Sequence, residues 1–210
     1  MRLAARTDPA FFEAKYRDDP HHDPWHFADD GYEQSRYRSL DRLLGGRCYG
    51  RAFEPGCSIG AFSRLLARRC DEVDAIDVSA TAIREAAHRN RDLRNVHHAV
   101  GAFPHWPFRP GHRYDLVCLV EIGYYFAPDE IGRAAGDVAD RLLVSGGDVL
   151  VSHWTGDSED HVLGGLEAQR LIARSLAASG LEPATGRRIA AGFVAERWHR
   201  PPVGPVEAVR

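Results

Sequence analysis

The 210-residue sequence lacks several features that mark particular classes of protein. No apolar run reaches the roughly 18 residues of a membrane-spanning helix, so we expect no membrane association. The first residues, MRLAARTDPAFFEAKY, lack the apolar stretch and small-residue cleavage site of a secretion signal. The four cysteines form no C-x-x-C pair, and their spacing suits neither a zinc ribbon nor a dense disulfide framework. These absences lead us to expect a reduced, cytoplasmic protein.

An excess of basic residues is missing as well. The chain has 27 basic and 30 acidic residues, a formal net charge of −3, and Lys15 as its only lysine. Proteins that hold nucleic acid through its phosphates normally carry a basic excess or a basic face, so we expect no nucleic-acid partner. His21, His22 and His26 lie close together, but no cysteine or glutamate at ligand spacing supports them, and we predict no metal site.

What the sequence does contain is the pattern of an α/β fold. From Ala52 to about Trp198, short apolar runs alternate with helix-like stretches, which predicts a doubly wound, mostly parallel sheet with crossover helices. The runs predict seven strands, at 51–54, 72–77, 95–100, 114–121, 148–153, 185–190 and 193–198. The last two are expected to form an antiparallel pair at the sheet edge. Helices are expected at about 61–70, 80–88, 128–143 and 166–178.

Two segments lie outside this alternation. Residues 1–46 are rich in aromatic side chains and partly helical in pattern. Residues 201–210 form a proline-broken tail that we expect to be disordered. The length of the chain favours one folded domain, which the alternating pattern assigns to residues 47–200.

The most informative segment is the turn Glu54-Pro-Gly-Cys-Ser-Ile-Gly60, between the first strand and the first helix of the sheet. Gly56 and Gly60 would let the backbone approach a ligand without a Cβ in the way. A dinucleotide site needs G-x-G-x-x-G, whereas here the spacing is G-x-x-x-G and Glu54 would repel a pyrophosphate. This argues against a nicotinamide-dependent dehydrogenase.

A second acid, Asp77, ends the second predicted strand. A carboxylate at that place can accept hydrogen bonds from both hydroxyls of a ribose. Glu54, in turn, can bind an ammonium group. The two acids together describe a nucleoside that carries an ammonium group and no phosphates, and S-adenosylmethionine fits that description.

Six short motifs, in order along the chain, carry a resemblance to a known family. They are Asp23-Pro-Trp-His-Phe27, Tyr32-Glu33 with Arg36-Tyr37, Glu54-Pro-Gly-Cys-Ser-Ile-Gly-Ala-Phe-Ser63, Asp77-Val-Ser79, Glu121-Ile-Gly-Tyr-Tyr125 and His153-Trp154. Over roughly residues 12–155 the chain resembles class I S-adenosylmethionine-dependent methyltransferases and, more narrowly, the family of the nodulation protein NodS. The resemblance implies a Rossmann-like methyltransferase fold in residues 47–200, with residues 1–46 as an N-terminal helical lid over the donor.

The residues expected to bind S-adenosylmethionine come from the lid and from the ends of four strands. They are Trp25, Arg36, Tyr37, Glu54, Gly56, Ser58, Gly60, Asp77, Val78, Ser79, Ala102, Phe103 and Glu121. The resemblance implies that Trp25 and Tyr37 lie near the methionine part of the donor and Arg36 near its carboxylate. The acid often found after the third strand in the superfamily is replaced by Gly101-Ala-Phe103, so we expect backbone and Phe103 to hold the adenine.

The acceptor side is predicted from the chemistry of methyl transfer. The sulfonium donor loses its charge in an in-line displacement, and a dry aromatic wall favours that loss. Tyr124, Tyr125 and Trp154, together with Trp25, are the candidates for this wall. Glu121 and His153 are the catalytic candidates, because a carboxylate or an imidazole can take the proton of an attacking amine. The alternatives are a capping or salt-bridged Glu121 and a His153 that only hydrogen-bonds nearby backbone.

The predicted acceptor-binding residues are therefore Tyr124, Tyr125, His153 and Trp154. The resemblance implies a small-molecule acceptor, the free amine of an amino sugar or chitooligosaccharide. It fades after residue 155, where 156–165 departs from the family and Gln169 stands in place of an expected histidine. An O- or N-methyltransferase of another natural-product biosynthetic pathway therefore stays open, as does a non-catalytic S-adenosylmethionine-binding protein. Either a monomer or a homodimer is compatible with the sequence.

Overall fold

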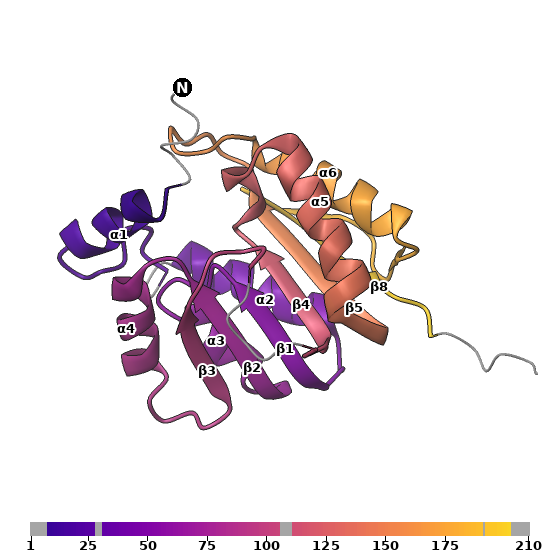
Figure 1. Cartoon of the computed structure of the whole chain (residues 1–210), viewed down its shortest axis with the longest axis horizontal. Coiled ribbons are helices and arrows are strands. Elements are labelled where there is room, and N and C mark those ends of the chain that lie inside the picture. Colours follow the sequence, from indigo (N-terminus) through magenta and orange to yellow (C-terminus); the bar gives the residue numbers. More distant parts are fainter. Residues whose placement is uncertain (1–7, 28–30, 106–110, 191, 203–210) are drawn as a thin grey trace, which may run out of the picture.

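The computed structural model of the chain describes residues 8–27, 31–105, 111–190 and 192–202. Eight strands in these residues form one sheet in the order β3-β2-β1-β4-β5-β8-β6, with β7 paired to β8 (Figure 1). The strands are β1 Tyr49–Pro55, β2 Cys70–Asp77, β3 Val96–Val100, β4 Tyr114–Val120, β5 Leu143–Trp154, β6 Glu182–Pro183, β7 Arg188–Ala190 and β8 Phe193–His199. The predicted tail at 201–210 lies outside the described residues, apart from residues 201 and 202.

Helices connect most of these strands. They are α1 Pro9–Asp18, α2 Gly31–Leu44, α3 Ala61–Leu66, α4 Ala80–Arg89, η2 Gly123–Tyr125, α5 Pro128–Asp137, η3 Val138–Leu142 and α6 Gly165–Ala178. The helix expected at 61–70 ends at Leu66, since the chain turns there into β2. The helix expected at 128–143 ends in the π-helical turn η3. No helix of the described residues is long and apolar enough to cross a membrane.

The doubly wound, mostly parallel sheet expected from the sequence is confirmed. Strands β1 to β5 run parallel, while β8 runs antiparallel to β5 and pairs antiparallel with both β6 and β7. The expected edge pair corresponds to β7 and β8. The sheet has one strand more than predicted, because the two-residue strand β6 is too short to leave a pattern of its own in the sequence.

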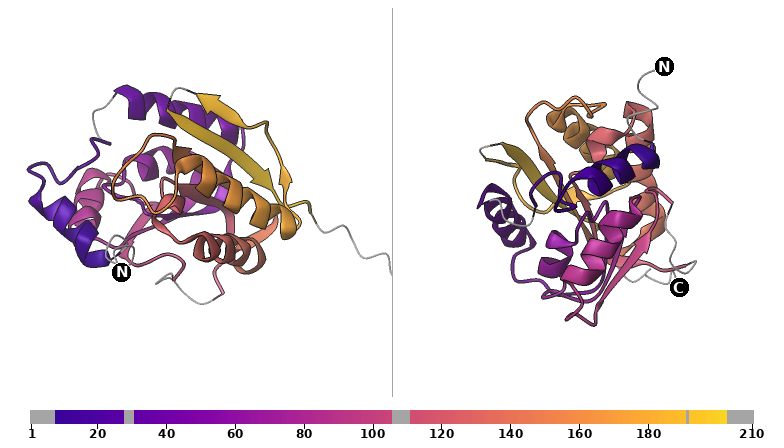
Figure 2. Two further views of the ribbon diagram at one scale, coloured as in Figure 1. Left: turned by 90° about the horizontal axis from the view of Figure 1, so that it is seen from above. Right: turned by 90° about the vertical axis from the view of Figure 1, so that its left-hand side faces the viewer.

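The core lies in two layers, one on each face of the sheet. Leu116 and Cys118 of β4 belong to the layer that includes Leu40 of α2, whereas Val117 and Leu119 belong to the layer under α5 and α6. Figure 2 shows α2 on one side of the sheet and α5 and α6 on the other. A strand covered on both faces is apolar at successive positions, which explains the continuous apolar run of β4.

The place of the functional site follows from the strand order. β1 and β4 are neighbours at the centre of the sheet, although α3, β2, α4 and β3 lie between them in the sequence. Their crossover connections therefore leave in opposite directions, and a crevice opens outside their carboxyl ends. Helix α1 packs against α4 at this end of the sheet (Figures 1 and 2).

Candidate active site

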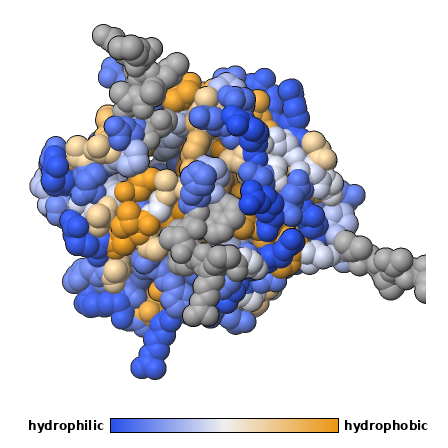
Figure 3. Space-filling view, viewed as in Figure 1, coloured by the Kyte–Doolittle hydropathy of each residue, from blue (hydrophilic) through white to orange (hydrophobic). Residues whose placement is uncertain are grey.

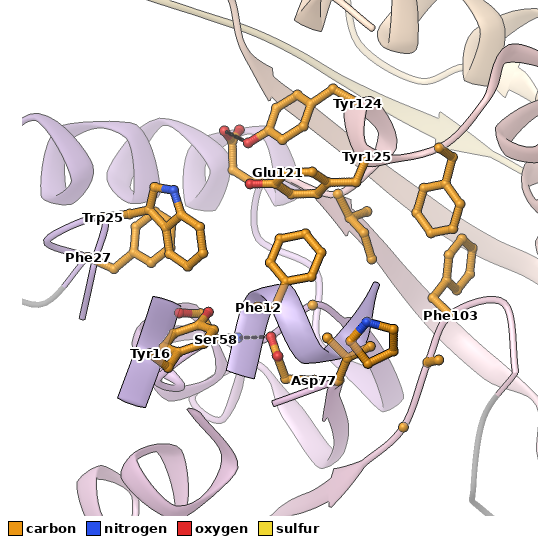
Figure 4. A pocket seen from close by; sticks show the side chains of 17 residues that line it. Phe12, Tyr16, Trp25, Phe27, Ser58, Asp77, Phe103, Glu121, Tyr124 and Tyr125 are labelled. Atoms are coloured by element: carbon orange, nitrogen blue, oxygen red, sulfur yellow. Dashed lines mark hydrogen bonds between the residues drawn. The ribbon is translucent and has the colours of Figure 1, made fainter. Parts of the chain in front are cut away.

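A cavity of about 260 Å³ lies in this crevice. The residues that line it come from α1, from the segment after α1 and from the chain that follows β1, β2, β3 and β4 (Figure 4). Ten of them were predicted as site residues: Trp25, Gly56, Ser58, Asp77, Val78, Ala102, Phe103, Glu121, Tyr124 and Tyr125. On the surface, apolar side chains gather beside α1 on the face viewed in Figure 3, whereas the rim of that face is hydrophilic.

A second, smaller cavity shares part of this lining. Gly56, Ser58 and Glu121 border both cavities. The smaller one is also lined by three predicted residues, Arg36, Tyr37 and Glu54. The fold therefore brings thirteen predicted residues to two adjoining cavities. Ten of them line the larger cavity, and three line only the smaller one.

Asp77 is held at the end of β2 by backbone donors. Its Oδ2 accepts the amide of Ser58 at 3.0 Å and its Oδ1 accepts the amide of Ser79 at 2.9 Å. Burial nevertheless raises the pKa of Asp77 to about 6, because the backbone hydrogen bonds only partly offset the loss of solvent. A carboxylate can accept more hydrogen bonds than these, and Asp77 lines the cavity, so a pair of hydroxyl groups can bind here.

The turn after β1 brings the backbone close to the cavity. Gly56 has φ +72°, and a Cβ there would lie 3.1 Å from Ile122 Cδ1. Ser58 adopts φ +50°, a conformation that is uncommon for a residue other than glycine. Its amide reaches Asp77 only because of this local backbone shape, so the turn and the carboxylate form one unit.

Glu54 is a buried carboxyl group at the end of β1. Its Oε2 accepts the hydroxyl of Ser63 at 2.6 Å. Burial raises the pKa of Glu54 to about 8, against the effect of the Ser63 hydrogen bond, and the nearby charge of Asp77 raises it further. At neutral pH the group is thus mostly protonated in the free protein, and a cation beside it would favour the carboxylate.

We expect binding of S-adenosylhomocysteine, which carries an ammonium group, to release a proton from Glu54 near pH 7. Because the ligand favours the ionised form, its affinity should rise with pH between about 6 and 8. Calorimetry in two buffers of different ionisation enthalpy measures the number of protons released. Glu54→Gln should abolish the release. An equal release in that variant would show that the proton comes from another group.

Glu121 follows β4 directly and has φ +55°, again outside the usual range for its residue type. Its Oε2 accepts the hydroxyl of Tyr124 at 2.8 Å and the amide of Trp154 at 3.1 Å. Its Oε1 pairs with the guanidinium of Arg36. These contacts hold the carboxylate at the border of both cavities. Figure 4 shows Glu121 beside Tyr124 in the larger cavity.

Arg36 lies between two carboxylates. Its guanidinium pairs with Glu33 of the same helix and with Glu121. Burial alone would lower the pKa of Arg36, but the charges of Glu121, Tyr37 and Glu33 raise it, so the side chain stays cationic. The sequence predicted Arg36 as a partner for the donor carboxylate. In the structure its charge is already matched by two glutamates, and its clearest effect is to orient Glu121.

Four predicted residues do not line either cavity. His153 is fully buried behind the wall, and Trp154 directs its ring toward Gly156. Gly60 packs against α4, where a Cβ would lie 2.5 Å from Asn90 Nδ2. Ser79 is the N-cap of α4, accepting the amide of Ala82 at 3.0 Å. Gly60 and Ser79 directly adjoin lining residues in the sequence, but neighbouring positions in a chain point in different directions.

Several lining residues were not predicted individually. Phe12, Tyr16 and Phe27 reach the larger cavity from α1 and from the segment after it. The ring of Phe12 contacts that of Tyr125 edge to face, with centroids 4.9 Å apart. Trp25 and Phe27 stack with centroids 6.0 Å apart. The aromatic composition of residues 1–46 was the signal, although it could not show which rings face the ligand.

Polar contacts fasten α1 on both sides of the cavity. On one side, Glu13 accepts the hydroxyls of Ser79 and Thr81, both at 2.6 Å, and the amide of Thr81 at 3.1 Å. These hydrogen bonds lower the pKa of Glu13 to about 2. On the other side, Lys15 pairs with Asp160 at 2.8 Å. A ligand in the cavity is therefore covered by a helix that is held at both edges.

Replacing Glu13 with alanine should loosen this cover. The net loss of about 1 kcal/mol expected for exchanged hydrogen bonds should let S-adenosylhomocysteine dissociate about five times faster. Stopped-flow fluorescence can follow the release through Trp25. Asp18→Asn is a matched control, because Asp18 lies on the same helix and is exposed. An unchanged release rate in the Glu13 variant would mean that α1 does not limit ligand exit.

Comparison with known proteins agrees with this geometry. The sequence model of the NodS family, described as Nodulation protein S, matches residues 13–196. Nodulation protein S of Sinorhizobium fredii (strain NBRC 101917 / NGR234) is 31% identical over 104 residues, 49% of this chain and 47% of that protein. The protein of the same name from Rhizobium tropici is 28% identical over 130 residues, 61% of this chain and 53% of that protein. The chain thus spans about half the length of the curated relatives it matches.

Among solved structures, the N-methyltransferase NodS from Bradyrhizobium japonicum WM9 in complex with S-adenosyl-L-homocysteine superposes with a TM-score of 0.74. The identity is 23%, over 93% of this chain and 99% of that one. The fold is the Rossmann-like fold of class I S-adenosylmethionine-dependent methyltransferases, as the sequence predicted. Since the family match covers most of the chain, the protein belongs to the NodS family.

Proposed function

We propose that the protein transfers the methyl group of S-adenosylmethionine to the amine of a small-molecule acceptor. The observation that carries the proposal is the placement of Asp77 and Glu121 on the walls of one cavity at the carboxyl ends of β2 and β4. Asp77 suits a ribose, and Glu121 suits a nitrogen that carries or gains positive charge. Membership of the NodS family supports the same activity.

The residues present fit the donor. Asp77 would accept the ribose hydroxyls, and the backbone at Ala102 with the ring of Phe103 would hold the adenine. In the smaller cavity, Glu54, which accepts the hydroxyl of Ser63, would bind the ammonium group. The backbone at Gly56 connects the two cavities and would pass close to the donor.

When bound, S-adenosylmethionine supplies an electrophilic methyl group on a positively charged sulfur. The protein contributes alignment and a dry environment. Trp25, Tyr124 and Tyr125 would exclude water and favour cationic groups through their ring faces. Glu121 would accept an N–H of the acceptor at a carboxylate oxygen and stabilise the positive charge that the nitrogen gains as its bond to carbon forms.

The structure favours Glu121 over His153 for this task. Glu121 borders the cavity, whereas His153 has no contact with it. Since Oε2 of Glu121 already accepts two hydrogen bonds, we assign it chiefly to orienting the amine and stabilising its charge. The ammonium product then loses its proton to solvent after transfer.

For the acceptor we propose the free amine of an amino sugar or a related metabolite. The anionic Glu121 favours an amine over a hydroxyl or an acid, because only the amine becomes cationic during transfer.

The test is incubation with methyl-labelled S-adenosylmethionine and a panel of amino sugars, their N-acetylated forms as matched controls, and hydroxyl and carboxyl acceptors. Label on the free amines alone would support the proposal. Label on the hydroxyl or carboxyl acceptors alone would refute N-methylation. Tight donor binding without transfer to any acceptor would favour the non-catalytic alternative.

A further inference from the structure

A buried network of hydrogen-bonded polar side chains, His153, Gln169 and Glu196, lies behind the wall of the larger cavity. The amide of Gly123 donates to Nε2 of His153 at 3.0 Å. Nδ1 of the same ring lies 2.9 Å from Oε1 of Gln169, and Nε2 of Gln169 donates to Glu196 at 3.4 Å. His153, Gln169 and Glu196 are all at least 96% buried. None of them lines the cavity, so this buried network supports the site without touching a ligand.

The hydrogen-bond donors of the buried network determine where its protons lie. A backbone amide can only donate, so Nε2 of His153 must be unprotonated. Nδ1 then carries the proton and donates it to the carbonyl oxygen of Gln169. The carboxylate of Glu196 accepts from the amide nitrogen of Gln169 and thereby fixes which end of that amide faces His153. Glu196 is itself paired with Arg187 and accepts from the indole of Trp198 at 3.1 Å.

The group held by His153 is the 3₁₀ turn η2, which carries Tyr124 and Tyr125 into the cavity. A Cβ at Gly123 would lie 2.5 Å from Nε2 of His153, so the turn approaches the imidazole as closely as a backbone can. The carbonyl of Tyr124 accepts the amides of Val162 and Leu163. The hydroxyl of Tyr124 reaches Glu121. A shift of η2 would therefore move both rings and take the Tyr124 hydroxyl away from Glu121.

We propose that His153 and Gln169 are positioning residues, which fix η2 and with it the aromatic wall and Glu121 on the acceptor side of the cavity. The acceptor part rests on the function proposed above. The arrangement requires a neutral imidazole, because protonation at Nε2 would set an N–H against the amide of Gly123. Gln169 accepts from Nδ1 through an uncharged carbonyl, and burial lowers the pKa of His153 by more than this hydrogen bond raises it.

The charged and titratable groups around His153 determine its protonation. Glu121 favours the imidazolium, while Arg36 and His161 oppose it. Tyr124 packs against the ring edge to face, with centroids 5.5 Å apart. Burial is the largest effect and lowers the pKa of His153, so the ring is neutral near pH 7. A carboxylate in place of Gln169 would shift this balance toward the imidazolium.

The test compares Gln169→Leu with Gln169→Glu. The leucine variant should lower kcat/KM for the acceptor by about ten- to a hundredfold at every pH, because misplaced groups cost that much in alignment. Its affinity for S-adenosylhomocysteine should change less than twofold. The glutamate variant should lose activity at acid pH and regain it as the pH rises and the imidazole is deprotonated.

Leu176→Ala is the control for stability, because Leu176 is buried on the same helix outside the buried network. It should melt earlier but keep the acceptor kcat/KM of the wild type.

Hydrogen exchange at the Gly123 amide and the ¹⁵N shifts of His153 give readouts that do not depend on activity. We expect Gln169→Leu to speed the exchange of this amide, and the wild-type shifts to show an unprotonated Nε2. Unchanged exchange and unchanged acceptor kinetics in the leucine variant would overturn the positioning role. An inactive wild type with the expected shifts and exchange would refute the proposed methyl transfer, while the fixing of η2 would stand.

Discussion

Exchanging Glu121 for glutamine should lower kcat for methyl transfer by about 10²- to 10³-fold, the range for losing one preorganised electrostatic contact with the transition state. Glutamine keeps an acceptor for Tyr124 and Trp154, so the wall around it should hold its shape. It lacks the negative charge that stabilises a cationic nitrogen. Rapid-quench measurement of a single turnover at saturating donor isolates this step.

Two controls make this result specific to the site. Asp148→Asn also removes a buried, ion-paired carboxylate, but in the middle of β5 and outside the lining of both cavities. It should leave kcat unchanged. Binding of S-adenosylhomocysteine to the Glu121 variant should stay within a few-fold of the wild type. A loss of this binding equal to the loss of kcat would assign Glu121 to the donor instead of the acceptor.

Replacing Asp77 with alanine should weaken S-adenosylhomocysteine binding by about 1–3 kcal/mol, roughly five- to 150-fold in Kd. The ribose hydroxyls would lose their charged acceptors, and the amides of Ser58 and Ser79 would lose their partner. Isothermal titration calorimetry measures the change directly. Because the pKa of Asp77 is raised to about 6 and the ribose favours the carboxylate, wild-type affinity should also decline as the pH falls below about 6.

Asp74 provides the matched control for this prediction. It is a buried carboxylate on the same strand, bonded to the hydroxyl of Tyr114 at 2.9 Å, and it does not line either cavity. Asp74→Asn should bind the ligand as the wild type does. Unchanged affinity in Asp77→Ala would place the ribose elsewhere in the crevice and remove the main support for the proposed donor pose.

Helix α1 and the buried network of His153, Gln169 and Glu196 act on different halves of the proposed reaction. Glu13 and Lys15 hold α1 over the cavity, so we expect changes there to alter ligand exchange. His153 and Gln169 hold η2, so we expect changes there to alter acceptor kinetics. Measuring both ligand release and acceptor kcat/KM in each variant separates the two effects.

The order of strands and helices could be predicted from the sequence because it depends on local pattern. Continuous apolar runs such as β4 are a consequence of burial on both faces, and this signal is present in the residues themselves. The same holds for Glu54, Gly56 and Asp77, because residues that end parallel strands must gather at one edge of the sheet. These residues predicted a nucleoside site at this edge, and in the structure they line the two cavities there.

The directions of side chains and the pairing of charges depended on tertiary structure. Glu121 and His153 lie at the carboxyl ends of two central strands, and the sequence named both as catalytic candidates. Packing directs Glu121 to the cavity and buries His153 under η2, where its two nitrogens are already engaged. Arg36 likewise meets Glu121 only through the fold, since 85 positions separate them in the chain. Contacts of this kind join distant segments, so no local pattern can specify them.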